Sequence, residues 1–270
     1  MRGKGIMWFI GVSGVSCALW VVALGWTMAN HMGLVQGGTP TPSSPAIAPI
    51  ELQPVTAAAD DGKLQVVSLG DSLARGTGDA TGKGYVGVAA ELMKARAGKR
   101  EVSVTNLGVN GFTSSQLSEQ IKRVDAQATI RQADVLLVSI GGNDLFRGGE
   151  TLAQLDLTKV KELETEYNQR LKFLLTEIRE LNPSANVYLI GLYNPFNGQK
   201  NSEITNGIVR DWNYQLSVTA ANIPKTVIVP TYDLFQLRVQ DYLAADLFHP
   251  NTEGYKRIGE RLGAIVVWEG

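Results

Sequence analysis

The sequence predicts an α/β domain in which helices cover both faces of a five-stranded parallel sheet. From residue 63 onward, short apolar runs alternate with longer segments of helical spacing, an order typical of strand–helix–strand units. The apolar runs are nearly continuous, which indicates strands that are buried on both faces. The chain has 270 residues, 44% of them hydrophobic, and is therefore long enough to bury such a sheet.

Five segments carry the strand pattern, because each contains a short run of apolar or β-branched residues. The third is the most continuous in its apolar character. In chain order the five lie in LQVVSLG (64–70), EVSVTNLG (101–108), ADVLLVSIGGND (133–144), NVYLIGLYNPF (186–196) and TVIVPTYDLF (226–235).

Five further segments have helical spacing, and several carry end signals. Gly98 is a C-terminal signal for the first, Ser114 or Ser115 can cap the second, and Asn182 with Pro183 ends the third. The five helical segments are 85–98, 114–124, 160–181, 203–221 and a closing helix that contains 258–267.

The first thirty residues are predicted to lie outside the folded domain. Residues 6–28 contain no charged side chain, and about 20 apolar residues suffice to span a bilayer. Arg2 and Lys4 precede them and no Lys or Arg follows before Lys63, so the positive-inside rule places the N-terminus in the cytoplasm. We therefore expect a single-pass anchor in the cell membrane with the folded domain outside; the alternative is a cleaved signal segment and a secreted domain.

The predicted domain organisation has three parts. Residues 1–30 form the membrane anchor or signal segment, and residues 31–62 form a tether rich in Pro, Gly, Ser, Thr and Ala. An arm packed on the domain is the alternative for this second part, because it contains a few apolar residues. Residues 63–270 form the folded domain, which we expect to be monomeric.

Composition narrows the classes of function. The formal net charge is −1 and no basic patch with interleaved aromatics occurs, so we expect no nucleic-acid partner. One cysteine, Cys17, and two histidines, His31 and His249, make a zinc site improbable. No EF-hand-like loop occurs either, and we expect neither a metal nor a cofactor.

Three polar turns follow the first three strands. Ser72 comes directly after the first strand, NLGVNG (106–111) ends the second, and GGND (141–144) follows the third. Ligands of such sheets bind beyond the carboxyl ends of the strands, so these turns are expected to meet at one edge. Their glycines let the backbone turn sharply and bring N–H groups close to a ligand.

A serine nucleophile needs a base, and His249 is the only imidazole placed to serve Ser72. Asp246 lies three residues before His249 and can orient the ring. The backbone N–H groups of Ser72 and Gly108 and the side-chain amide of Asn143 are candidate donors to an oxyanion. Taken alone, Ser72 would be interpreted as a helix cap and Asn143 as a turn residue.

Other residues near these turns have candidate supporting roles. Asp71 and Asp144 are expected to brace their turns by hydrogen bonds. Several residues can line a substrate pocket, with ordinary packing as the equal alternative. They are Asp71 before the serine, Tyr193, Asn194 and Phe196 after the fourth strand, and Phe248 beside the base.

Together these residues resemble the SGNH, or GDSL-type, hydrolase family. GDSLARG is similar to its nucleophile block and NLGVNG to its glycine block, while GGND resembles its asparagine block and DLFHPN its Asp-x-x-His block. The four blocks occur in the family's order, and the resemblance covers about residues 64 to 267. With the apolar N-terminus and tether, it extends to membrane-anchored lipase/acylhydrolase-like proteins of Gram-positive bacteria.

The resemblance implies a three-layer α/β/α, flavodoxin-like SGNH hydrolase fold, here preceded by one transmembrane helix. It implies hydrolysis of carboxylic esters or thioesters without a cofactor, by a Ser72–His249–Asp246 triad through an acyl-enzyme. The expected substrate is a lipid ester or an acylated glycan. A carbohydrate or cell-wall O-acetylesterase is one alternative, and a catalytically inactive surface domain that binds a ligand or partner is the other.

Overall fold

A parallel five-stranded sheet forms the centre of the computed structural model, which describes residues 62–146, 151 and 155–268. The strand order is β2-β1-β3-β4-β5, and every neighbouring pair is parallel. This is the doubly wound order of flavodoxin-like folds, as the sequence predicted. The strands are β1 (Lys63–Gly70), β2 (Glu101–Asn106), β3 (Val135–Ser139), β4 (Asn186–Ile190) and β5 (Thr226–Val229).

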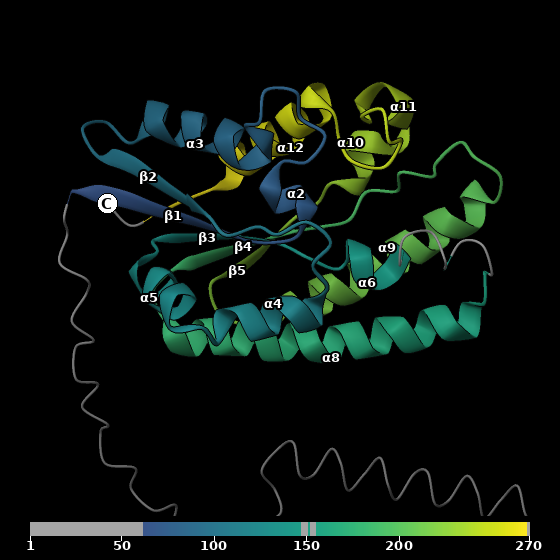
Figure 1. The fold of residues 1–270 in the computed structure, drawn as a ribbon, viewed down its shortest axis with the longest axis horizontal. Helices are drawn as coiled ribbons and strands as arrows, with labels where there is room; N and C mark the ends of the chain where they lie inside the picture. Colours follow the sequence, from purple (N-terminus) through teal and green to yellow (C-terminus); the bar gives the residue numbers. More distant parts are fainter. Residues whose placement is uncertain (1–61, 147–150, 152–154, 269–270) are drawn as a thin grey trace, which may run out of the picture. The chain divides into compact units, whose positions relative to one another are not determined.

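Helices cover both faces of the sheet and complete three layers (Figure 1). One face carries α2 (Ser72–Arg75), α3 (Gly84–Arg96), α10 (Tyr232–Gln236), α11 (Val239–Tyr242) and α12 (Thr252–Ile265). The other face carries α4 (Ser114–Ile121), α5 (Val124–Gln132), α6 (Gly142–Phe146), α8 (Leu157–Leu181) and α9 (Ser202–Ala221).

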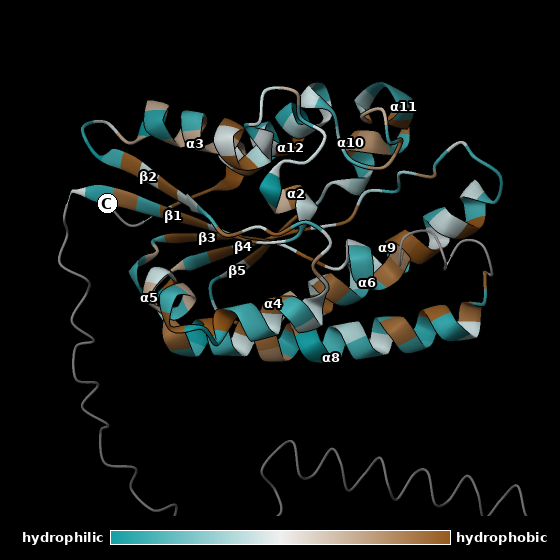
Figure 2. Ribbon diagram, viewed as in Figure 1, coloured by the Kyte–Doolittle hydropathy of each residue, from teal (hydrophilic) through white to brown (hydrophobic). Residues whose placement is uncertain are grey.

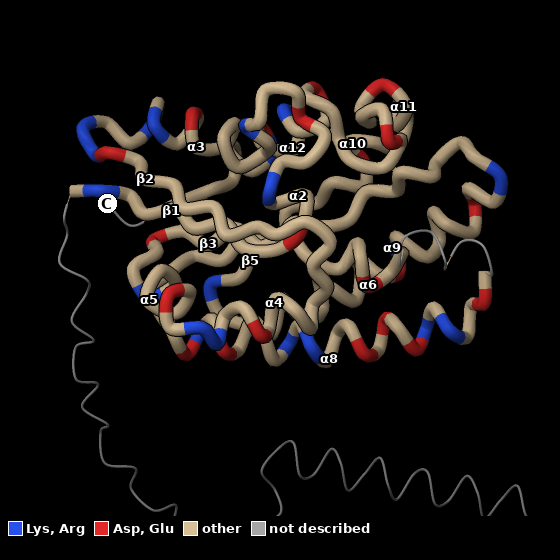
Figure 3. The backbone as a smooth tube through the Cα atoms, in the orientation of Figure 1, with Lys and Arg blue, Asp and Glu red and all other residues tan. Residues whose placement is uncertain are grey.

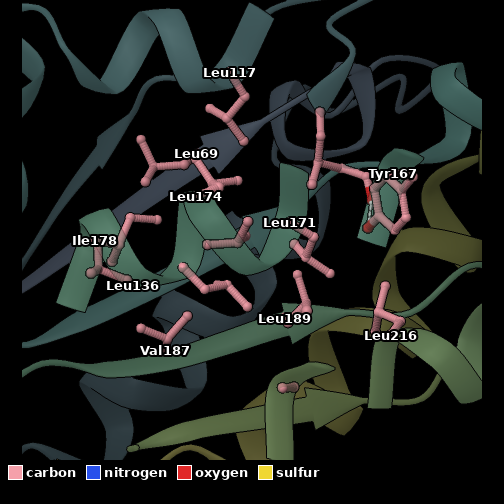
Figure 4. Packing of buried hydrophobic residues seen from close by; sticks show 14 of the residues in the cluster. Leu69, Leu117, Leu136, Tyr167, Leu171, Leu174, Ile178, Val187, Leu189 and Leu216 are labelled. Carbon is pink, nitrogen blue, oxygen red and sulfur yellow. Dashed lines mark hydrogen bonds between the residues drawn. The ribbon is translucent and has the colours of Figure 1, made fainter. Parts of the chain in front are cut away.

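Alternate residues of the central strand build two separate cores. Leu136 and Val138 of β3 point into the core under α8, whereas Val135 and Leu137 point into the core under α3 and α12. The central strand β3 is accordingly hydrophobic along most of its length in Figure 2, whereas β1 and β2 begin with hydrophilic residues. Figure 4 shows the first core, in which the leucines of α8 lie over β3 and β4 and Tyr167 donates a hydrogen bond to the Ile140 carbonyl.

The solvent face of α8 carries charges of both signs, which Figure 3 shows along the whole helix. Ion pairs such as Lys159–Glu162 link neighbouring turns of this face. Most charged residues between 159 and 172 thus lie on the solvated helix face that the sequence predicted, but Glu164 is buried.

Three details of the predicted helices are wrong. Thr113, rather than Ser114 or Ser115, caps α4, and it does so in a capping box with Gln116. The closing helix ends at Ile265, so its last predicted residues lie beyond it. The short helices α2, α6, α10 and α11 were not predicted, because four or five residues are too few for a clear helical period. The nine-residue helix α5 was not predicted either.

The predicted anchor at 1–30 lies outside the described residues, as does the predicted tether at 31–62 apart from Gly62. Among the helices of the described ranges, none is both long enough and apolar enough to cross a membrane.

Candidate active site

Ser72 begins α2 at the carboxyl end of β1. The turn needs Gly70, because a Cβ atom there would lie 1.9 Å from the Ser139 carbonyl oxygen of the neighbouring strand. Asp71 then caps α2, since its Oδ1 accepts a hydrogen bond from the Leu73 N–H at 2.9 Å. Because Asp71 does the capping, the Ser72 hydroxyl does not serve as the helix cap.

The Ser72 hydroxyl meets the imidazole of His249. Ser72 Oγ lies 2.8 Å from His249 Nε2, and His249 Nδ1 lies 2.6 Å from Asp246 Oδ2. Asp246 Oδ1 also accepts the backbone N–H groups of Phe248 and His249, each at 3.0 Å. The structure therefore joins the three residues that the sequence singled out into one hydrogen-bonded chain.

The hydrogen bonds to Asp246 decide its charge. Desolvation acts to raise the pKa of this carboxyl, but the bonds from the His249 ring and from two backbone N–H groups outweigh it and hold the pKa below its usual value. Asp246 is therefore ionised at neutral pH. An ionised Asp246 favours the imidazole tautomer that carries its proton on Nδ1 and leaves Nε2 to accept from Ser72.

The loop that carries His249 is fixed by two residues from other segments. The Tyr193 hydroxyl donates to the Phe248 carbonyl at 2.6 Å. Gly78 (φ +95°) packs directly against the loop, because a Cβ atom there would lie 2.6 Å from the Pro250 oxygen and 3.0 Å from His249 Cβ. The position of the imidazole thus depends on residues far from it in sequence.

Asn251 anchors the same loop from its other end. Its Oδ1 accepts the Gly254 N–H and thereby caps α12. Its Nδ2 donates to the carbonyls of Asp241 and Leu243 at 2.9 and 3.1 Å. One side chain therefore ties the histidine loop to both α11 and α12.

Asp71 is a buried carboxyl beside the site. It accepts hydrogen bonds from the Leu73 N–H and from Ser139 Oγ, so it braces the turn as expected. Burial nevertheless raises the pKa of Asp71 from 3.8 to about 6, against the lowering effect of these bonds and of His249. This shift in pKa could not be predicted from the sequence, because it depends on how deeply the turn is buried.

The candidate oxyanion donors differ in their availability. As the first residue of α2, Ser72 has a backbone N–H without a partner inside the helix. Asn143 Nδ2 donates one hydrogen to the Phe112 carbonyl at 2.8 Å and retains a second one. The Gly108 N–H donates to Asn106 Oδ1 at 2.9 Å, so it can reach an oxyanion only by sharing this hydrogen.

Gly108 has a packing role that the sequence did not reveal. A Cβ atom there would lie 2.7 Å from the Arg75 nitrogen and 2.9 Å from Ala74 Cβ. Asn106 Nδ2 reaches the Ala74 carbonyl in the same place. The glycine turn therefore lets the end of β2 approach the helix that carries the serine.

A pocket of about 410 Å³, open mouth included, lies beside the hydroxyl of Ser72. Its polar side includes Ser72, Asn143 and His249, which are thereby brought together. Its apolar wall consists of Phe146, Leu192, Tyr193, Pro195 and Phe248. Tyr193, Phe248 and Asp71 line the pocket as expected, and Phe146 is a lining residue that the sequence analysis missed.

Two predicted pocket residues lie behind this wall instead. Asn194 is buried, and its amide donates to Thr205 Oγ1 and Asn206 Oδ1, so it holds the chain after β4 against α9. Phe196 does not line the pocket, but its ring centroid lies 5.3 Å from that of Phe146. It therefore supports the apolar wall from outside.

Asp144 joins three helices rather than bracing its own turn. Its Oδ1 and Oδ2 accept the hydroxyl and the N–H of Ser114 in α4, at 2.6 and 2.9 Å. Arg170 of α8 lies 3.6 Å from Oδ1. Across 62–146, 151 and 155–268, no group of three or more His, Cys, Asp or Glu is placed to hold a metal ion.

These features can be compared with known proteins. Residues 68–257 match the model of the GDSL-like lipase/acylhydrolase family. The match covers more than half of the sequence and includes the three hydrogen-bonded residues Ser72, Asp246 and His249. The protein therefore belongs to this family of hydrolases, as the four sequence blocks indicated.

Individual relatives agree with this assignment. The chain is 35% identical to the uncharacterized protein YpmR of Bacillus subtilis over 77% of this chain and 83% of that protein. It is 27% identical to the spore germination lipase LipC of Bacillus licheniformis over 74% of this chain and 95% of that protein. The crystal structure of the lipase Lip_vut3 from a goat rumen metagenome matches with a TM-score of 0.69 and 27% identity, over 75% of this chain and 97% of that one.

Proposed function

We propose that this protein is a serine hydrolase of carboxylic esters, in which Ser72, His249 and Asp246 act as a catalytic triad. The observation that carries the proposal is the continuous hydrogen-bonded chain from Ser72 Oγ through both ring nitrogens of His249 to Asp246. This is the arrangement in which an imidazole can take a proton from a serine hydroxyl.

In the proposed acylation step, His249 Nε2 takes the hydroxyl proton while Ser72 Oγ attacks the ester carbonyl carbon. The tetrahedral intermediate collapses when the C–O bond to the alcohol breaks, and His249 returns the proton to the departing oxygen. In deacylation, His249 takes a proton from water while the water oxygen attacks the acyl-enzyme carbonyl. The C–O bond to Ser72 then breaks, His249 returns the proton to Ser72 Oγ, and the carboxylic acid is released. Asp246 stabilises the charged imidazolium in both steps.

The negative charge that develops on the carbonyl oxygen needs hydrogen-bond donors. We assign this role to the Ser72 N–H and to Asn143 Nδ2. The Gly108 N–H is the proposed third donor, and its hydrogen is then shared with Asn106 Oδ1. The nearby apolar wall suits the acyl part of the substrate, because burial of its methylene groups is favourable.

The proposed location of the protein in the cell rests on the sequence alone. The charge pattern of residues 1–62 supports a membrane anchor with the hydrolase domain outside the cytoplasm. In that position lipid esters and acylated glycans are both within reach.

The full hydrogen-bonded chain of Ser72, His249 and Asp246 supports catalysis rather than simple ligand binding.

A serine-directed covalent reagent tests the proposal. A fluorophosphonate should label the wild-type protein, and mass spectrometry should place the adduct on the peptide that contains Ser72. Labelling should be lost in His249→Ala, because the hydroxyl then lacks its base. A protein that stays unlabelled, or one labelled equally well without His249, would overturn the proposal.

A further inference from the structure

A second, polar hollow begins where the apolar pocket ends. Asn143 lines both. From Asn143 the hollow runs between the start of α4 and the middle of α8, and it has a volume of about 900 Å³ with its open mouth. We call it the α4–α8 groove. Its remaining lining residues include Thr113, Ser115, Glu166 and Arg170.

Arg170 is held in place on one side of the α4–α8 groove. Its Nε donates to Ser114 Oγ at 2.9 Å, and its guanidinium lies 3.6 Å from Asp144 and 3.5 Å from Glu166. The Arg170 side chain is still 34% exposed, so some of its N–H groups can turn to a ligand. Its orientation is set before a ligand binds.

The α4–α8 groove offers acceptors as well as donors. Glu166 is 55% exposed, and its carboxylate forms a long pair of 3.5 Å with Arg170. Ser115 is exposed on the first turn of α4. Two carboxylates, Asp144 and Glu166, face one guanidinium, so the charges around Arg170 sum to −1. This net negative charge repels an anionic group. A neutral hydroxyl, by contrast, can both donate a hydrogen bond to Glu166 and accept one from Arg170.

The position of the α4–α8 groove relates it to the ester. The apolar wall of Phe146, Leu192, Pro195 and Phe248 suits the acyl chain of the substrate. The α4–α8 groove begins at Asn143, next to the proposed oxyanion site, and its lining is polar. It is therefore suited to the polar half of the same molecule.

We infer that the α4–α8 groove binds the alcohol half of the substrate, and that this alcohol is uncharged and carries free hydroxyl groups, as in a glycerol or sugar ester. Glu166 and Arg170 are its specificity-determining residues. The inference rests on the proposed function, because it concerns the substrate of the same site. It distinguishes polyol esters from simple alkyl esters and from esters of phosphorylated alcohols.

Two esters that differ only in hydroxyl groups test the inference. 1-Monobutyrin and propyl butyrate share their acyl chain and their carbon skeleton, and their hydrolysis can be followed by titration of the released acid. The wild type should have a higher kcat/KM for monobutyrin. In Glu166→Ala the ratio of the two kcat/KM values should fall about tenfold, the size expected for loss of a hydrogen bond to a charged group.

Two further variants separate recognition from general damage. Glu166→Gln keeps an acceptor and should retain most of the ratio. Glu162→Ala is the matched control, because Glu162 lies on α8 with a similar exposure of 56% and outside the α4–α8 groove. Its ratio should equal that of the wild type.

The outcomes separate the inference from the proposed function. An unchanged ratio in Glu166→Ala, with hydrolysis that still depends on Ser72, would overturn the inference alone. A ratio that falls equally in Glu162→Ala would also overturn it. If no ester is hydrolysed in a Ser72-dependent manner, the proposed function fails and the inference fails with it.

Discussion

Ser72 Oγ lies 2.8 Å from His249 Nε2, although 177 residues separate the two in sequence. The contact is held from both sides. Asp71 caps the helix that begins with Ser72, while Tyr193, Gly78 and Asn251 hold the loop of His249. The geometry that the proposed triad requires is therefore imposed by the surrounding fold, and each support can be tested.

Asp246→Asn should lower kcat by about 10²–10⁴-fold, because an amide supports the wrong imidazole tautomer and does not stabilise the imidazolium. KM should change little. Asp241→Asn is a suitable control, since Asp241 is similarly exposed but pairs with Arg238 on α11. Steady-state kinetics of both variants check the prediction, and equal activity in the two would contradict it.

Asn143→Ala should lower kcat by about 10²–10³-fold, the usual effect of losing one oxyanion donor. Asn186→Ala removes an amide that also donates to a backbone carbonyl, that of Val267, but lies at the start of β4. This control should keep its full kcat. A loss confined to KM in Asn143→Ala would argue against the assigned role.

Gly78→Ala should displace the histidine loop, because the new methyl group would lie 2.6 Å from the Pro250 oxygen. A shift of about 1 Å at a catalytic group can cost on the order of 100-fold in rate. Gly82 also has a positive φ, +71°, but a Cβ atom there meets nothing within 4 Å. Gly82→Ala should therefore bear a similar backbone strain and keep its activity. Equal kcat values for the two variants would show that Gly78 does not position His249.

Asp71→Asn should change how stability depends on pH. Since the pKa of Asp71 rises from 3.8 to about 6 on folding, the folded state binds this proton more tightly, and stability falls as pH rises from about 4 to above 6. The shift corresponds to roughly 3 kcal/mol at about 1.36 kcal/mol per pKa unit. Asparagine does not titrate, so urea unfolding between pH 4 and 7.5 should lack this decrease. The stabilising effect of Asp79, whose pKa is lowered to about 2, is lost mainly below pH 4, as pH falls, so Asp79 does not cause this decrease. A decrease of the same size in the variant would exclude Asp71 as its source.

The strands could be predicted from the sequence because burial on both faces leaves a continuous apolar run, as in Val135 to Ser139. Ser72 could be predicted because it directly follows β1, and parallel strands end at one edge of the sheet. His249 and Asp246 could be predicted because a serine nucleophile needs a base, although α10 and α11 separate them from β5. Most other contacts between distant segments could not be predicted. The pairing of Arg170 with Ser114 depends on how α8 crosses α4, and the raised pKa of Asp71 depends on burial.

The residues that line the pocket could likewise be predicted only in part from the sequence. Asn194 and Phe196 follow β4 as closely as Tyr193 does, yet only Tyr193 lines the pocket. Which side chain of a loop faces a ligand is decided by the path of the backbone. In this loop, the path is set by the hydrogen bonds that Asn194 makes to Thr205 and to the Phe196 N–H.

The most direct test of the central claim compares kcat/KM for p-nitrophenyl butyrate between the wild type and Ser72→Ala. Ser202→Ala serves as the control, because Ser202 likewise begins a helix but lies outside the site. We predict hydrolysis by the wild type and by Ser202→Ala, and a loss of at least about 1,000-fold in Ser72→Ala, whose fold should be unchanged by circular dichroism. Ser72→Ala that hydrolyses the ester at the wild-type rate would contradict the role of Ser72 as the nucleophile.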